Sequence, residues 1–120
     1  MKTSELTKAA LDWAVAKCEK LDAYTDMVGV GWGVFVDYSD DYYNINYRPS
    51  ENWGWAGPII EREKIGINFI QGQWVADTTD MDDIYEQVEY GETPLVAAMR
   101  CYVASKLGDD VEVPKEVADE

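Results

Sequence analysis

Apolar side chains in this chain recur with a helical period at both ends and with a strand period between them. Residues 3–21 predict a helix, because apolar side chains return there every three or four positions. This stripe consists of Leu11, Ala14, Cys18 and Leu21. The polar residues expected on the opposite, solvent-facing side are Lys8, Asp12, Glu19 and Lys20.

Residues 27–36 predict the clearest strand, because apolar residues alternate there with glycines. Gly29, Gly31 and Gly33 would leave a bare stripe of backbone on one face of this strand. Each glycine weakens a strand, so we expect something to approach the stripe closely. A tightly packed helix or strong sheet curvature would explain it, and so would a ligand or a partner.

The remaining middle of the chain reads as short strands separated by turns and loops. Turn-forming residues occupy 38–41, and Pro58 suits the first position of a short helical turn over 59–63. Further strands are expected at 42–47, 65–69 and 73–76. Residues 77–92 are interpreted as an acidic loop.

The C-terminal helix has the strongest boundary signals. Thr93 can cap it, Pro94 suits its first position and Gly108 can end it. The order of elements predicts an α+β fold, a mainly antiparallel sheet of about four strands with the two long helices, N- and C-terminal, packed on one face. Residues 1–108 are expected to form this single domain, and residues 109–120 a flexible acidic tail.

The net charge of −14 is unevenly distributed along the 120 residues. Seven acids and no base lie between Asp77 and Glu92. Direct binding of nucleic acid is not expected, because it requires Lys and Arg side chains to displace counterions. Such a surface can dock on a basic protein or imitate a nucleic acid, or it can simply keep the protein soluble.

The sequence contains no histidine, which removes the commonest general base and most catalytic zinc sites. No recognised nucleophile or phosphate-loop motif replaces it, so we expect neither an enzyme nor a cofactor or metal. The chain contains five Trp and eight Tyr but only two Phe. Trp and Tyr favour partly solvent-exposed positions such as clefts and interfaces, although they also suit the margin of a core.

Three segments form a recognisable set: 4–7 with 10–17 (SELT and ALDWAVAK), 57–63 (GPIIERE) and 93–100 (TPLVAAMR). Together they resemble the NinX-like family of small bacteriophage proteins. The resemblance implies an accessory phage product made while the phage takes over a bacterial cell, and hence a location in the host cytoplasm. The family has no established activity, so the resemblance supplies no site residue.

Two functional hypotheses follow. The first is a pocket for a small nucleotide-like molecule, because aromatic faces stack bases and Arg binds phosphate. Its candidate residues are Trp32, Tyr42, Asn44, Trp53, Trp55 and Arg62. The second is an acidic decoy or adaptor that docks on a basic host protein, anchored by tyrosine. Its candidate residues are Asp80, Asp82, Asp83, Tyr85 and Glu86.

The N-terminal residues predict an amphipathic segment rather than a signal peptide, and the chain has no apolar run of the about 20 residues that cross a bilayer. We therefore expect a cytosolic protein with reduced thiols and no membrane partner. The partner is a small molecule or a host protein, and the sequence does not decide the oligomeric state.

Overall fold

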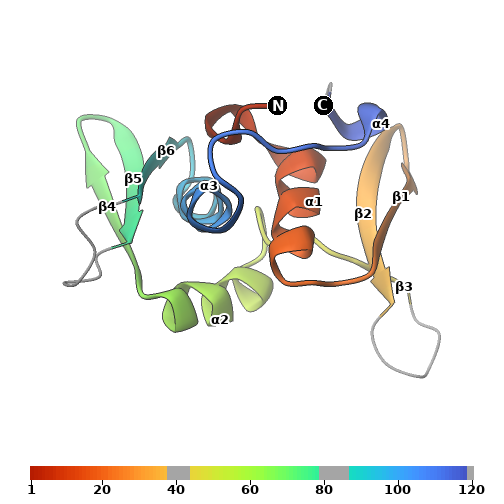
Figure 1. Cartoon of the computed structure of the whole chain (residues 1–120), viewed down its shortest axis with the longest axis horizontal. Helices are drawn as coiled ribbons and strands as arrows, with labels where there is room; N and C mark the ends of the chain where they lie inside the picture. The colour runs from red at the N-terminus through yellow and green to blue at the C-terminus, as the bar shows by residue number, and fades with distance from the viewer. Residues whose placement is uncertain (38–43, 79–86, 119–120) are drawn as a thin grey trace.

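Two three-stranded antiparallel sheets enclose a pair of helices (Figure 1). The structure is a computed structural model and describes residues 1–37, 44–78 and 87–118. The first sheet has the order β1 (Ala23–Val28), β2 (Gly31–Asp37), β3 (Asn44–Asn46), and the second β4 (Ile65–Ile70), β5 (Gln73–Thr78), β6 (Gln87–Gly91). Helices α1 (Lys8–Cys18) and α3 (Pro94–Leu107) lie between the sheets.

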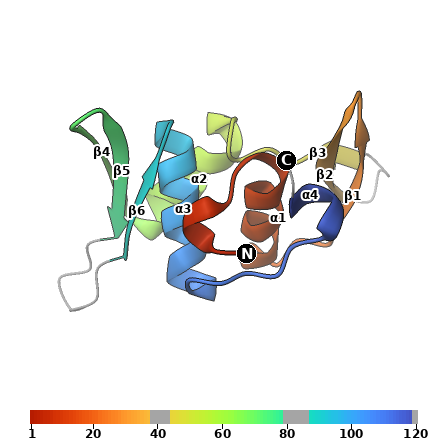
Figure 2. The same ribbon diagram turned by 90° about the horizontal axis from the view of Figure 1, so that it is seen from above.

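The two central helices are apolar on nearly every side, because each is covered on opposite sides. Figure 1 looks along α3 and Figure 2 looks along α1, so the helices cross rather than run side by side. Alanines dominate their contact surface and allow the backbones to approach closely. These buried alanines are Ala9, Ala10, Ala14 and Ala16 of α1 and Ala97, Ala98 and Ala104 of α3. Within the described ranges, no helix is both long enough and apolar enough to cross a membrane.

The α+β class with antiparallel pairing is confirmed, but the single sheet of about four strands with helices on one face is wrong. The predicted strand over 27–36 is a hairpin, in which Val28 pairs with Gly31 across a turn at Gly29 and Val30. Gly29 has a φ of +62°, the conformation that a type II′ hairpin turn places at its first central residue. The turn reverses the chain and creates an additional sheet on the far side of α1.

The glycine stripe is explained within this hairpin. A Cβ at Gly33 would lie 2.7 Å from Cγ2 of Val28 and 3.3 Å from Oδ1 of Asn46. These neighbours belong to the adjacent strands of the same sheet. The close approach at Gly33 therefore comes from cross-strand side chains and not from a helix.

Helix α2 (Trp53–Glu63) begins at Trp53 instead of at Pro58. Asn52 caps it, because its side-chain Oδ1 accepts a hydrogen bond of 2.7 Å from the backbone N–H of Gly54. Lys64 ends it in the left-handed conformation, with a φ of 55°. The boundary signals of α3 are confirmed, since Thr93 caps it, Pro94 is its first residue and Gly108 follows its last.

The chain after α3 runs back across the N-terminal segment, which includes the short helix η1 (Thr3–Glu5). The backbone N–H of Thr3 donates to the carbonyl of Asp109, and the N–H of Val111 donates to the carbonyl of Met1. Helix α4 (Lys115–Ala118) then lies on α1 and β2. Val117 is fully buried. Flexibility of residues 109–120 stays a prediction, while the structure places this valine in the core.

Candidate functional site

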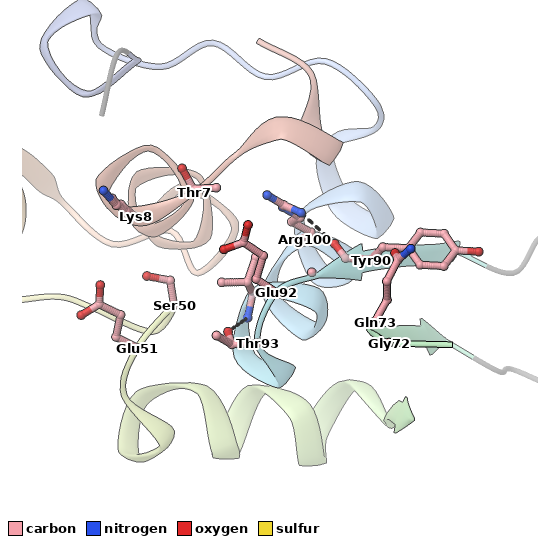
Figure 3. A pocket seen from close by; sticks show the side chains of 12 residues that line it. Thr7, Lys8, Ser50, Glu51, Gly72, Gln73, Tyr90, Glu92, Thr93 and Arg100 are labelled. Atoms are coloured by element: carbon pink, nitrogen blue, oxygen red, sulfur yellow. Dashed lines mark hydrogen bonds between the residues drawn. The ribbon is translucent and has the colours of Figure 1, made fainter. Parts of the chain in front are cut away.

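A cleft of about 600 Å³ opens where α1 and α3 begin, and we name it the Ser50 cleft (Figure 3). Ligand pockets in proteins usually enclose about 300–1,000 Å³, so the cleft has room for a metabolite-sized molecule. Its walls are Thr7, Lys8, Ser50, Glu51, Gly72, Gln73, Tyr90, Gly91, Glu92, Thr93, Val96 and Arg100.

The N-termini of α1 and α3 line this cleft, and the loop over 48–52, which leads into α2, forms part of its wall. Thr7 precedes α1, Asn52 caps α2, and the Thr93 hydroxyl accepts a hydrogen bond of 3.1 Å from the N–H of Val96 in α3. The loop is closed by hydrogen bonds from the N–H groups of Glu51 and Asn52 to the carbonyl of Arg48. Helix N-termini carry partial positive charge, so this face is locally more favourable for an anion than the net charge suggests.

Arg100 supplies a fixed positive group to the cleft. Its Nε donates to the carbonyl of Leu6 and its Nη1 to the carbonyl of Tyr90, both at 2.8 Å. Nη2 has no hydrogen-bond partner within the described ranges. Burial lowers the pKa of Arg100, and the neighbouring acids Glu89 and Glu92 oppose that shift. Since arginine normally titrates far above neutral pH, the guanidinium stays charged and can bind an acceptor through Nη2.

Carboxylates give the cleft a mixed character. Glu51 forms an ion pair with Arg48 at one side of the cleft. Figure 3 shows the Glu92 side chain between α1 and α3. Carboxylates accept hydrogen bonds from hydroxyl and amine groups. The cleft therefore combines an anion-binding corner with acceptors for polar hydrogens, an arrangement that suits a ligand carrying both kinds of group.

Asp12 of α1 holds the loop over 48–52 in place beside the cleft and is only 4% exposed. Its Oδ1 accepts a hydrogen bond of 2.8 Å from the backbone N–H of Ser50. Burial raises the pKa of Asp12 to about 7, although the N–H and the hydroxyl of Ser50 both lower it. That hydroxyl makes no hydrogen bond of normal geometry to any described residue. The prediction that Asp12 faces solvent is wrong, because the loop over 48–52 covers that side of α1.

Replacing Asp12 with asparagine is expected to flatten the pH dependence of stability. The folded protein keeps a proton on Asp12 up to about pH 7, whereas the unfolded chain releases it near 3.8. Between about pH 4 and pH 7 the folded state therefore binds more protons than the unfolded chain, so the free energy of unfolding falls as the pH rises. Asp12 alone should account for a fall on the order of 4 kcal/mol across this range. Asparagine retains the acceptor for the Ser50 N–H. Urea denaturation at a series of pH values measures the difference, and a wild-type and variant that respond alike to pH would refute the assignment.

The structure separates the predicted ligand-binding residues. Trp53, 56% exposed, lines a hollow of about 270 Å³ that adjoins the Ser50 cleft and shares Ser50, Glu51 and Thr93 with it. Trp32 lines a different hollow of about 210 Å³, on the β2 side of Lys8 and Glu51. These two tryptophans therefore flank the loop over 48–52 from opposite sides.

Trp55 and Arg62 do not reach the cleft. The Trp55 ring meets Tyr47 edge-on at 5.1 Å between centroids, at the margin of the core. Arg62 forms a forked pair with Glu19, its Nη2 lying 2.6 Å from Oε2. Burial alone would raise the pKa of Glu19, but the hydrogen bonds from Arg62 and Tyr102 outweigh it and lower that pKa. The Arg62 guanidinium therefore links α2 to the residue that follows α1, close to Tyr102 of α3.

The other predicted residues lie outside the described structure in whole or in part. Asn44 pairs with Asp37 through the β2–β3 ladder, and its side chain is not described. The predicted residues outside the described ranges are Tyr42, Asp80, Asp82, Asp83, Tyr85 and Glu86. Sequence reasoning assigned no ligand role to Arg100. The signal was present as a single charged residue within the apolar run 95–104.

Comparison with known protein families matches residues 2–106 to the family described as Bacteriophage P22, NinX. The matched segment includes both sheets, the two central helices and every residue that lines the Ser50 cleft. No curated protein matches the chain. The function of the cleft is therefore argued from its geometry.

Proposed function

We propose that this chain, which belongs to the Bacteriophage P22 NinX family, is a non-enzymatic binding protein that holds a small nucleotide-like molecule in the Ser50 cleft. The supporting observation is that a cleft of metabolite size, the hydrogen-bonded Arg100 and the exposed Trp53 lie close to the loop over 48–52. The assignment keeps the ligand class that the aromatic content suggested and moves the site from the sheet to the helix N-termini.

The Ser50 cleft and the adjoining hollow lined by Trp53 suit different parts of such a ligand. Nη2 of Arg100 can bind a phosphate group, and the partial positive charge at the start of α3 favours the negative charge there. The exposed face of Trp53 can stack a base, which contributes about 1–3 kcal/mol. Between them, the carboxylates of Glu51 and Glu92 can accept hydrogen bonds from sugar hydroxyls.

The reactive groups of the chain favour binding over catalysis. The sequence has no histidine, and burial raises the pKa of both thiols, Cys18 and Cys101, to about 12. A buried thiol that stays protonated at neutral pH is a poor nucleophile. Binding without turnover fits a phage product that sequesters a host nucleotide in the bacterial cytoplasm, which is the biological role we infer.

A melting-temperature screen of purified protein against common nucleotides tests the proposal. A ligand present at about 100 times its dissociation constant should add about 2.7 kcal/mol of stability and raise the melting temperature by several degrees. Trp53→Ala should weaken binding of that nucleotide about tenfold or more, because it removes the stacking surface while the rest of the cleft remains.

Trp32→Ala is the matched control, since it removes the same side chain from the neighbouring hollow. We expect it to bind the nucleotide as the wild type does. Loss of binding in Trp32→Ala alone would move the site to the β2 side of the loop. A screen without any shift would overturn the proposal.

A further inference from the structure

The outer face of the β4–β5–β6 sheet carries exposed apolar side chains. Strand alternation turns Ile65 and Ile67 toward α3 and turns Ile70 away from it. Val75 and Tyr90 pair directly across β5 and β6 on this outward side. Ile70, Val88 and Tyr90 are 52%, 41% and 53% exposed. We name the outer patch as Ile70, Val75, Val88 and Tyr90.

No described element covers this patch. Figures 1 and 2 both show the second sheet at one end of the molecule, with α3 behind it and no described helix or strand in front. An antiparallel sheet with one solvated face normally alternates apolar residues inside with polar residues outside. A group of apolar residues on the solvated face is therefore unusual and is typical of an interaction surface.

Charge indicates what kind of partner fits. Between Lys64 and Arg100 the sequence contains no Lys or Arg and seven acids. One of these acids, Asp77, pairs with Val88 on the outward face. Asp77 beside the apolar patch and the net charge of −14 on the chain both favour a basic partner and would steer it to the site. A second copy of this chain would bring another charge of −14 to the same place, which opposes association.

We propose that the outer patch docks a basic protein surface in which apolar side chains lie among lysines and arginines. Tyr90 and Ile70 would be buried at the centre of the contact, since tyrosine is enriched at interface hot spots. Of the outer-patch residues, Tyr90 also lines the Ser50 cleft, whereas Ile70, Val75 and Val88 do not. Variants that leave Tyr90 in place therefore separate docking from the ligand proposed for the cleft.

The test uses a synthetic amphipathic helix with leucines on one face and lysines around them. Two control helices replace the leucines with serine or the lysines with glutamate. We expect only the Lys/Leu helix to bind, and its affinity should fall strongly in about 1 M salt, where charges are screened beyond about 3 Å. Hydrogen exchange should show protection on β4, β5 and β6.

A matched pair of double variants locates the contact. Ile70→Thr with Val88→Thr removes apolar groups from the outer patch and should weaken binding about tenfold or more. Met27→Thr with Val28→Thr changes side chains that are 50% and 44% exposed on the other sheet and should leave binding unchanged. Tyr90 is left intact because it also lines the Ser50 cleft.

Three outcomes would overturn the proposal. The first is equal binding by both double variants, and the second is binding of the Lys/Ser helix as tight as that of the Lys/Leu helix. The third is self-association of the protein, measured by sedimentation, that the outer-patch variant abolishes, because it would make this face a contact between copies. Nucleotide binding by the outer-patch variant should match the wild type, so failure here is distinct from failure of the cleft proposal.

Discussion

Gly91→Ala is expected to cost about 3 kcal/mol of unfolding free energy, a large loss for a single added methyl group. A Cβ at position 91 would lie 2.5 Å from the backbone nitrogen of Ala97 and 3.0 Å from its Cα. Both atoms belong to the first turns of α3 and cannot swing aside like a flexible side chain. Strand β6 would have to move away from α3, and the Ser50 cleft would change shape with it. Chemical denaturation measures the loss.

Gly57→Ala is the matched control for this effect. Gly57 lies within α2, and apart from its chain neighbours a Cβ added there would meet no atom within 4 Å. Alanine is a better helix former than glycine by about 0.5–1 kcal/mol, but a Cβ before Pro58 crowds the proline ring in the helical conformation, so this variant should change stability much less than Gly91→Ala. Equal changes of the same sign in both variants would contradict the close packing of β6 on α3.

Val117→Asp is expected to destabilise the protein by at least about 3 kcal/mol. The Val117 side chain is fully buried where α4 lies on α1 and β2. An aspartate there would be either an unpaired buried charge or a buried neutral acid, and both states cost several kcal/mol. Thermal and urea denaturation of the full chain measure the effect.

The same substitution at Val30 shows whether the loss of stability at Val117 comes from burial of the aspartate or only from its added charge. Val30 lies in the β1–β2 turn and is fully exposed, so Val30→Asp should change stability by less than about 0.5 kcal/mol. If Val117→Asp is equally harmless, then residues 109–118 do not pack on α1, and the flexible tail expected from the charge pattern describes them better.

Local signals in the sequence predicted α3 because they are contained within the element. Thr93 and Pro94 fix its start and Gly108 fixes its end, each through a backbone requirement of one or two residues. The same holds for the class of the fold, since the two periods distinguish helix from strand without knowledge of tertiary contacts.

The hairpin at Gly29 shows why the sheets were harder to predict. The alternation of glycine with valine and tryptophan continues unbroken through the turn, so the two-residue period carries no mark of the reversal at Val30. Only the left-handed conformation of Gly29 reveals it. Strand β6 was likewise interpreted as part of an acidic loop, because its pairing with β5 and its packing on α3 are nonlocal.

The arrangement of two sheets around two helices did have a sequence signal. A helix that is apolar all round is buried on all sides, and the alanines of α1 and α3 leave little polar surface. Lys8 and Asp12 were interpreted as part of a solvent-facing polar stripe, but Asp12 is buried in the structure. The burial of Asp12 follows from the same enclosure of α1.

The sequence suggested residue types for a ligand site but not which of those residues would lie together. Trp53 lies beside the cleft, but Arg62 is held by Glu19, 43 residues away in the sequence. No local pattern indicates that ion pair. Arg100 became a candidate only when the fold brought the carbonyls of Leu6 and Tyr90 to its guanidinium.

The central claim is that a nucleotide-like molecule binds around the loop over 48–52, where α1 and α3 begin. Hydrogen exchange of the wild-type protein, with and without the nucleotide that gives the largest melting shift, tests it most directly. We predict slower exchange in residues 48–53 and in the first turns of α1 and α3, with Ile70, Val75 and Val88 of the outer patch unchanged. Protection confined to the β1–β2 hairpin or to the β4–β6 sheet, or no protection at a saturating concentration, would contradict the claim.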